Sequence, residues 1–458
     1  MKKLWPLLLL FVTAASSQTR LTVPYERFIL PNGLNVILHE DHTTPTVTVN
    51  VWYHVGSGNE KLGRTGFAHL FEHLLFEGSG HVPEGAFDEW LEAAGGNNNG
   101  STNTDRTNYF ETIPANALEL ALFLESDRMG YLLEAMSSGK VDGQRDVVKN
   151  ERRQSVENQP YGMSFVIIGE STYEPNHPYH WPTIGYMDDL TAASYDDVVE
   201  FFKKYYTPSN ASLVIAGDLN PGQTRALVEK WFSDVQGRPR PALIDAPPAV
   251  LAEEKRLVYE DRVQLPRLYL AWLTPPLLAP GDAEMDLVAS VLAGGKNSRL
   301  YKRLVYDMQI AQEVSAFQAS RPMSSYFMIT ATARSGHTLA ELEKVVQEEI
   351  DRLKQTAPDA REVQRAVNQY EANFLGGLEV VGSKADQLNN YYRNTGNPDY
   401  FNEDLARYLA LDPADVRTAA LTNLPDNARV ILSIVPQGKT ELASGQCKKY
   451  EVKQRGTN

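Results

Sequence analysis

The chain of 458 residues contains only one cysteine, Cys447, so an intrachain disulfide is excluded. Its stability must come from burial of apolar side chains, and the length is sufficient for two or more domains. Basic side chains are also under-represented, with 44 lysines and arginines against 58 aspartates and glutamates, which gives a formal net charge of −14. This acidity argues against nucleic acid or an anionic membrane surface as a partner.

Long hydrophobic runs are missing as well. The apolar run at residues 4–12 is too short to cross a bilayer. It follows Lys2 and Lys3 and precedes a stretch of small residues, which is the pattern of a secretory signal peptide. We therefore expect residues 1–17 to be a signal peptide, and the mature protein to be periplasmic or secreted and not embedded in a membrane.

The most informative feature that is present is the stretch His69-Leu70-Phe71-Glu72-His73. In a helix, residues i, i+3 and i+4 lie on one face, so both imidazoles and the carboxylate can meet at one point. Two neutral imidazoles make half of a tetrahedral zinc site, and a carboxylate that does not bind the metal can deprotonate a metal-bound water. The order His-x-x-Glu-His is the inverzincin motif. The alternative is an amphipathic helix whose histidines form hydrogen bonds within the core.

Local patterns predict an alternation of strands and helices in the first half of the chain. A hairpin is expected at residues 27–38, and the polar stretch 97–110 is expected to be an exposed loop that leads into a strand. Further strands are predicted at residues 47–53 and 212–217, and helices at 66–76, 86–94, 116–129, 142–157 and 195–205.

The second half of the chain repeats this plan. Residues 409–435 resemble residues 190–218, because in both a helix leads through Pro-x-Asn-Ala to an apolar strand. Such a repeat predicts an α+β fold with two duplicated domains, each a mostly antiparallel sheet packed with helices. The region 287–303, which corresponds to the motif region, contains no histidine, so one metal site per chain is expected.

The expected domain limits follow from this repeat and from a Pro-rich segment between its copies. The N-terminal domain with the metal site spans residues 24–236, the linker 237–255, the C-terminal domain without a metal site 256–440, and a tail 441–458.

Three segments, Thr65–Gly78, Val147–Glu151 and Pro208–Ala211, together resemble the insulinase/pitrilysin family of zinc metallopeptidases. The resemblance extends over residues 26–435. The half-length chain is similar to mitochondrial processing peptidase subunits and bacterial periplasmic homologues, in which two chains of this size pair, each forming half of a clamshell. The resemblance implies that His69, His73 and Glu151 bind one Zn²⁺ and that Glu72 is the general base. For Glu151 alone, the alternative is a solvated charge on a helix. The apolar Val147 and Val148 are expected on the buried side of this helix.

The polar residues Asn99, Gly100, Ser101 and Thr102 resemble the edge strand on which this family binds its substrates. An exposed edge offers unpaired backbone groups to an extended peptide and so tolerates many side chains. The alternative for these residues is a solvated loop.

The sequence departs from the family in two places. Gln144 stands where many active members carry a second glutamate, seven residues before the ligand glutamate. Val305 and Gln312 stand where many members carry an arginine and a tyrosine that stabilise the developing oxyanion, and Arg303 and Tyr306 are out of register. We therefore expect a heterodimer with a homologous chain that supplies the Arg/Tyr pair, with a homodimer as the rival.

The expected function is that of a zinc-dependent endopeptidase that hydrolyses short unfolded peptides. The alternatives are a non-catalytic peptide-binding or scaffold homologue, and a processing peptidase with one maturation substrate. His177 and His180 flank Pro178 and are expected to have a structural role or to lie at the rim of the substrate site.

Overall fold

The computed structural model describes residues 20–452, so the predicted signal peptide at residues 1–17 lies outside the described part. Two six-stranded sheets form the framework. The first contains β1 (Glu26–Ile29), β2 (Asn35–Glu40), β3 (Thr46–Tyr53), β4 (Asn97–Thr102), β5 (Thr107–Pro114) and β6 (Ala211–Gly217). The second contains β7 (Lys255–Asp261), β8 (Arg267–Thr274), β9 (Ala311–Ala319), β10 (Ser325–Ala333), β11 (Val430–Pro436) and β12 (Lys448–Lys449).

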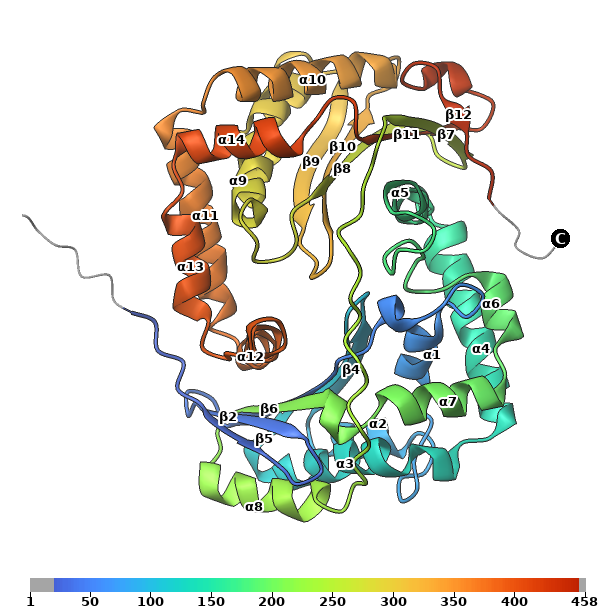
Figure 1. Cartoon of the computed structure of the whole chain (residues 1–458), viewed down its shortest axis with the longest axis vertical. Helices are drawn as coiled ribbons and strands as arrows, with labels where there is room; N and C mark the ends of the chain where they lie inside the picture. Colours follow the sequence, from blue (N-terminus) through green and yellow to red (C-terminus); the bar gives the residue numbers. More distant parts are fainter. Residues whose placement is uncertain (1–19, 453–458) are drawn as a thin grey trace, which may run out of the picture.

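The strand order is β1-β2-β6-β3-β5-β4 in the first sheet and β12-β7-β11-β8-β10-β9 in the second. The pairs β2–β6, β7–β11 and β7–β12 are parallel. All other neighbouring pairs are antiparallel. The two sheets lie at opposite ends of the long axis of the molecule (Figure 1). The prediction of an α+β fold with two duplicated, mostly antiparallel sheets is therefore confirmed.

Helices surround both sheets. In the first half of the chain they are α1 (Phe67–Leu74), α2 (Ala86–Ala93), α3 (Leu118–Ala135), α4 (Ser138–Arg152), α5 (Ser164–Thr172), α6 (Met187–Ala192), α7 (Tyr195–Tyr205) and α8 (Pro221–Phe232). In the second half they are α9 (Asp282–Ala293), α10 (Leu339–Gln355), α11 (Ala360–Gly377), α12 (Val381–Thr395), α13 (Phe401–Leu409) and α14 (Pro413–Asn423). Among the described residues, no helix has the length and apolar character needed to cross a membrane.

The two halves exchange one helix each. Helix α12, from the second half, lies on the first sheet, where Ala385 and Leu388 pack with Val214 of β6. Helix α5, from the first half, lies on the second sheet, where Ile167 packs with Leu432 of β11. Figure 1 shows both helices beside the sheet of the other half. The exchange covers the second face of each sheet, which explains why β6 and β11 are buried at every residue and are apolar except for one serine each.

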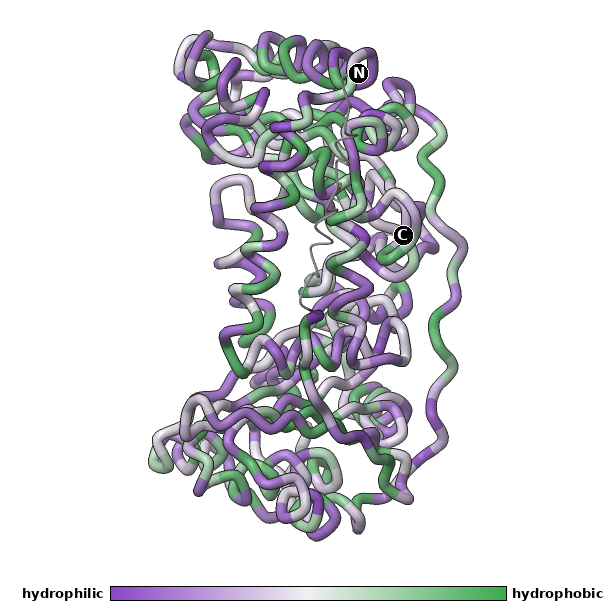
Figure 2. Tube along the Cα trace, turned by 90° about the vertical axis from the view of Figure 1, so that its left-hand side faces the viewer, coloured by the Kyte–Doolittle hydropathy of each residue, from purple (hydrophilic) through white to green (hydrophobic). Residues whose placement is uncertain are grey.

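An extended segment joins the two halves. Residues 236–252 contain neither helix nor strand, and they run along one side of the molecule (Figure 2). Proline-rich composition explains this conformation, because proline lacks a backbone N–H and holds φ near an extended value. The predicted limits of the domains stay a prediction, and the exchanged helices show that neither half packs by itself.

Three local predictions need correction. Residues 97–110 are not a loop before a strand: β4 and β5 pair as a hairpin across this stretch. Helix α4 ends at Arg152, and residues 153–157 form a π-helical turn instead of a continued α-helix. Val147 was expected on the buried side of α4, but it is 45% exposed, whereas Val148 is fully buried. Consecutive residues point about 100° apart on a helix, so an apolar pair does not show whether both of its members or only one faces the core.

Candidate metal centre and substrate edge

Helix α1 is held at its N-terminus by a buried carboxylate. Glu60 accepts hydrogen bonds from the backbone N–H of Gly66 at 2.9 Å and of Ala68 at 2.8 Å. These bonds satisfy amides that have no partner within the helix. Burial raises the pKa of Glu60 well above its usual value, although the two backbone hydrogen bonds oppose this shift. Glu60 thereby fixes the start of the helix that carries His69, Glu72 and His73.

Helix α4 presents Glu151 one residue before its end. The following Arg152 is buried, and its Nη1 donates a hydrogen bond to the carbonyl oxygen of Gly185 at 2.5 Å. Gly185 in turn lies directly against Gly66, since a Cβ added to Gly185 would be 2.4 Å from the Cα of Gly66. The two helices are therefore tied to each other through Gly185. The π-helical turn after Arg152 is of a kind often found at functional sites.

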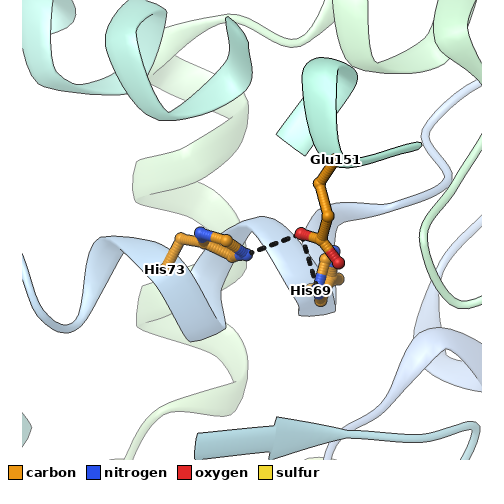
Figure 3. Close-up of side chains that lie close together, drawn as sticks. All are labelled: His69, His73 and Glu151. Atoms are coloured by element: carbon orange, nitrogen blue, oxygen red, sulfur yellow. Dashed lines mark ion pairs between the residues drawn. The ribbon is translucent and has the colours of Figure 1, made fainter. Parts of the chain in front are cut away.

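Figure 3 shows the result of this arrangement, with His69 and His73 on α1 and Glu151 reaching toward them from α4. Oε2 of Glu151 lies 3.3 Å from Nε2 of His73 and 3.7 Å from Nε2 of His69. One potential ligand atom from each of the three residues lies within 4.8 Å of the other two. Within residues 20–452, this is the only such group of histidine, cysteine, aspartate and glutamate side chains.

The electrostatics of this group favour a cation. Burial lowers the pKa of His69, although Glu151 opposes the shift, so the imidazole is biased toward its neutral form. A hydrogen bond from His73 lowers the pKa of Glu151, which keeps the carboxylate ionised. Neutral imidazole and ionised carboxylate are the forms that bind metal ions. Two imidazole nitrogens and one carboxylate oxygen also form a donor set of catalytic zinc sites, which leave a fourth position open. The residues therefore fit a zinc ion.

Glu72 lies on α1 between the two histidines, outside the three-residue group, and faces strand β4. A Cβ added to Gly100 would lie 3.1 Å from Cγ of Glu72 and 3.4 Å from Phe76. The strand thus passes closely beside the carboxylate, and a larger residue at position 100 would push against it. Because β4 is the last strand in its sheet, one of its edges has no neighbouring strand among the described residues.

Asn99, Gly100, Ser101 and Thr102 therefore all belong to an edge strand beside Glu72, and none of them lies in a loop. Ser101 is partly engaged, since its carbonyl oxygen accepts a hydrogen bond from Nη1 of Arg106 at 2.8 Å. The binding of substrate to these four residues stays a prediction.

The residues that depart from the family pattern have defined contacts. Gln144 donates a hydrogen bond from Nε2 to Oε1 of Glu77 at 2.6 Å. A carboxylate is thus still present near His73, but it comes from residue 77. Burial, with a contribution from Glu84, raises the pKa of Glu77.

In the second half, Arg303 forms ion pairs with Glu348 and Glu349, so its charge is already compensated. The side chain of Tyr306 is 73% exposed, and Gln312 is exposed as well. Val305 packs against the core of the second half. None of these four residues lies in the group formed by His69, His73 and Glu151.

His177 and His180 are buried away from that group. The His177 ring stacks on Tyr173 with centroids 4.9 Å apart, and Nδ1 of His180 lies 2.9 Å from the carbonyl oxygen of Tyr173. His180 also lines a cavity of about 620 Å³ between α5 and the second sheet. Both contacts are consistent with the expected structural role.

Glu60, Arg152 and Gly185 were not recognised from the sequence. Glu60 precedes the motif and reads as an ordinary surface charge, and Arg152 reads as part of a charged helix. A glycine gives no sequence signal of the residue that it approaches. Their partners lie in distant segments or depend on a turn geometry that only the folded chain defines.

Comparison with known proteins agrees with this geometry. Residues 35–174 match the family model "Insulinase (Peptidase family M16)", and residues 192–370 match "Peptidase M16 inactive domain". The chain is 30% identical over 393 residues to zinc protease PqqE of Helicobacter pylori, with 83% of this chain and 87% of that protein covered. The chain belongs to the M16 family of peptidases.

One further relative and one solved structure are also similar to this chain. It is 24% identical to the probable mitochondrial-processing peptidase subunit beta of Arabidopsis thaliana, with 92% of this chain and 79% of that protein covered. It superposes on the crystal structure of a protease from Helicobacter pylori with a TM-score of 0.85 and 26% identity, which covers 90% of this chain and all of that chain. The resemblance predicted from the motifs is thus confirmed. His69, Glu72, His73 and Glu151 all lie within the segment that matches the insulinase model.

Proposed function

We propose that this M16 family member is a zinc-dependent endopeptidase that hydrolyses short unfolded peptides. The observation that carries the proposal is the convergence of His69, His73 and Glu151 from two helices, with Glu72 beside them and next to an open sheet edge. The names of relatives such as zinc protease PqqE support the same assignment.

In this proposal His69, His73 and Glu151 hold one zinc ion per chain. When bound there, zinc supplies a Lewis acid that polarises the scissile carbonyl and makes water more acidic. Glu72 takes a proton from the attacking water and later delivers it to the leaving amine. The edge of β4 holds the peptide in an extended conformation by backbone hydrogen bonds, with Asn99, Gly100, Ser101 and Thr102 along it. Because this chemistry needs no acyl-enzyme, no serine or cysteine nucleophile is required.

We further infer that the active form pairs with a second chain. Val305 has no side-chain donor where an arginine is expected, and Gln312 offers a neutral amide where a tyrosine hydroxyl is expected, so this chain lacks the cationic donor of an Arg/Tyr pair at these positions. A homologous chain in a heterodimer is the proposed source of that pair, and a homodimer is the rival. The likeness to a protein named as a subunit supports pairing. Location in the periplasm or outside the cell rests on the signal-peptide pattern at residues 1–17.

The experiment that tests this function combines metal analysis with a peptidase assay. Wild type and Glu72→Gln are measured with and without a co-expressed homologous chain, on a panel of unrelated unfolded peptides. We expect one zinc per chain in both proteins and a fall in kcat of about 10²–10⁴-fold in Glu72→Gln, because only the proton transfer is removed.

A matched control is Glu92→Gln, which changes an exposed glutamate on α2 and should retain full activity. Unchanged cleavage by Glu72→Gln, or a wild-type protein that binds no zinc, contradicts the proposal. Cleavage of a single peptide in the panel would favour a dedicated processing enzyme over general peptide hydrolysis.

A further inference from the structure

A second feature lies at the far end of the substrate edge. A cavity of about 280 Å³ opens where three elements meet: the β4–β5 turn, the β9–β10 turn and helix α12. Each element contributes one arginine to its lining, Arg106, Arg321 and Arg393 respectively. The arginines come from both halves of the chain, so the cavity exists only in the assembled fold.

None of these three arginines has a carboxylate within ion-pair distance among the described residues. Other arginines of the chain do form ion pairs, for example Arg256, Arg299, Arg303 and Arg407. Nη1 of Arg106 donates to the carbonyl oxygen of Ser101, and Nη2 of Arg393 donates to the carbonyl oxygen of Asp105 at 3.2 Å. The Nε atoms of Arg106 and Arg393 are buried without a hydrogen-bond partner. Both guanidinium groups therefore keep an N–H group that the described residues leave without an acceptor.

Aromatic rings hold two of the guanidinium groups in place. Arg106 lies over the ring of Trp52 at 5.1 Å, and Arg321 lies over the ring of Tyr179 at 5.2 Å. Stacking of this kind orients a planar guanidinium without neutralising its charge. The side chains are thus fixed before any ligand arrives, which reduces the entropy lost on binding.

Two carboxylates lie nearby, and both are occupied by neutral donors. Asp105 lines the cavity and accepts hydrogen bonds from the hydroxyl groups of Tyr179 and Thr104, each at 2.7 Å. Asp386, behind the cavity, accepts a hydrogen bond from Nε1 of Trp52 at 3.0 Å. The lining itself therefore carries three positive charges against one negative charge, in a protein whose formal net charge is −14.

Burial makes this concentration of charge costly at Arg106, whereas Tyr173, Tyr326 and Asp105 raise the pKa of Arg321 in spite of its burial. Desolvation lowers the pKa of Arg106, and Asp386 and Glu72 only partly oppose the shift. A buried cation without a counter-ion destabilises a fold. An anion in the cavity would satisfy the unused N–H groups and restore the charge balance.

The position of the cavity relative to Glu72 indicates which molecule supplies the anion. Thr102, the last residue of β4, lines the cavity, and Gly100, two residues earlier, lies against Glu72. At about 3.4 Å per residue of extended chain, the separation is roughly 7 Å. A peptide that extends along β4 with its scissile bond at Glu72 therefore reaches the cavity with a group about two or three residues away.

We propose that this three-arginine cavity binds a carboxylate of the peptide substrate, either an aspartate or glutamate side chain or the free C-terminal carboxylate. The proposal rests on the function proposed above, because it takes β4 as the substrate strand. Arginine fits this task, since its planar guanidinium can bind a carboxylate through two parallel hydrogen bonds. The cavity would then set a preference for acidic peptides on one side of the cleaved bond.

Binding and cleavage are measured separately to test this. An uncharged fluorescent ten-residue peptide is compared with versions that carry one glutamate at each position in turn, each as the free acid and as the C-terminal amide. Binding is measured by fluorescence anisotropy with metal-free Glu72→Gln protein, and kcat/KM with zinc-loaded wild type in the presence of the homologous partner chain. We expect one glutamate position, or the free C-terminus, to improve both values by about tenfold or more, which is the range for a charge-assisted hydrogen bond.

Arginine variants then test whether this cavity causes the preference for acidic peptides. Arg393→Gln and Arg321→Gln should each remove most of this preference, measured as the ratio of acidic to uncharged peptide binding within the same variant. Arg267→Gln is the matched control, because Arg267 already forms an ion pair with Glu313 at 2.7 Å and lies outside this cavity. Loss of the preference on amidation identifies the C-terminal carboxylate as the ligand, and its survival on amidation identifies a side chain.

Equal binding of acidic and uncharged peptides at every position overturns the inference, and so does a preference that survives in both arginine variants. The two proposals can fail independently. A preference in binding without any cleavage by zinc-loaded protein in the presence of the partner chain contradicts the proposed peptidase function alone. Cleavage without any preference for acidic peptides contradicts the carboxylate site alone.

Discussion

Helices α1 and α9 occupy equivalent places in the two halves of the molecule. Helix α1 follows β3 along the chain and α9 follows β8, and these two strands hold the same position in their sheets. Each helix is preceded by a glycine in the left-handed conformation, Gly66 with φ 88° and Gly281 with φ 99°. Counted from these glycines, the positions of His69, Glu72 and His73 correspond to Glu284, Leu287 and Val288 in α9. The counterpart of the motif therefore begins three residues before the region 287–303 that the repeat predicts. Leu287 and Val288 are buried in the core of the second half.

The two helices also differ in the partners of their ionisable side chains. On α9, Asp282 forms an ion pair with Arg407 at 2.8 Å, and Asp286 accepts a hydrogen bond from the hydroxyl group of Tyr408 at 2.7 Å. On α1, Nε2 of His69 and Nε2 of His73 lie 3.7 Å and 3.3 Å from Oε2 of Glu151, which belongs to α4. The second half shows that the shared framework folds by apolar packing without a metal-binding group. The zinc residues in the first half are therefore expected to serve chemistry and not folding.

The largest expected effect comes from removal of one ligand. His73→Ala should lower zinc affinity by more than about 100-fold and abolish cleavage, since a ligand matters more than the outer groups whose loss costs 10–100-fold. The metal-free protein should still fold, with its thermal midpoint within about 4 °C of metal-free wild type. Zinc titration and thermal unfolding measure both properties.

The control for this variant is His42→Ala, which removes an exposed histidine and should retain zinc and activity. An unfolded His73→Ala protein would show that the first half, unlike the second, depends on its metal residues to fold.

A smaller effect is expected at the glycine that ties α4 to α1. Gly185 and Gly85 both have φ 78°, but a Cβ on Gly185 would lie 2.4 Å from Gly66, whereas a Cβ on Gly85 meets nothing within 4 Å. Both alanine variants share the backbone strain of about 1 kcal/mol. Gly185→Ala should lose a further 1–3 kcal/mol, on the order of an overpacked core, and bind zinc more weakly.

Urea unfolding measures the loss of stability in each variant, and zinc titration measures the effect on the metal site. Together they distinguish backbone strain, which both variants share, from displacement of the helices, which only Gly185→Ala should cause. If Gly85→Ala and Gly185→Ala lose the same stability and bind zinc equally, Gly185 has no part in positioning the site.

The smallest effect concerns the second half. Burial raises the pKa of Asp286 to about 7 from its usual 3.8, although the hydrogen bond from Tyr408 opposes the shift. Between pH 4 and 7 the folded state therefore keeps a proton that the unfolded state has lost. Stability from this group is present at low pH and is lost as the pH rises through 7.

Asp286→Asn should remove this pH dependence, so that its stability relative to wild type increases by about 2 kcal/mol from pH 4 to pH 8 after allowance for partial solvent exposure. Chemical denaturation across this range is the measurement, with the exposed Asp307→Asn as a control that should keep the wild-type slope. Identical slopes in all three proteins would show that Asp286 does not titrate differently in the folded and unfolded states.

The sequence was sufficient for features that arise within one segment. The spacing of His69, Glu72 and His73 predicts one helix face, because helical periodicity fixes it, and the repeat predicts the duplicated sheets. Glu151 was assigned only through the family resemblance, since no local pattern connects two separate helices. Val147 was misplaced because an apolar pair on a helix does not show which member faces the core.

Other features depend on how distant segments meet. The apolar faces of α5 and α12 predict burial, but they do not reveal that each helix lies on the sheet of the other half. Arg106, Arg321 and Arg393 come from three separate parts of the chain, and each alone reads as a surface charge. Their common cavity follows only from the packing of the two halves against each other.

The most direct test of the account is a titration of zinc into metal-free protein, followed by calorimetry and by peptide cleavage in the presence of the partner chain. The account predicts one binding site per chain, with cleavage that rises in proportion to bound zinc and reaches its maximum at one equivalent. Cleavage by the metal-free protein, or a second zinc site of similar affinity, would contradict a single centre formed by His69, His73 and Glu151.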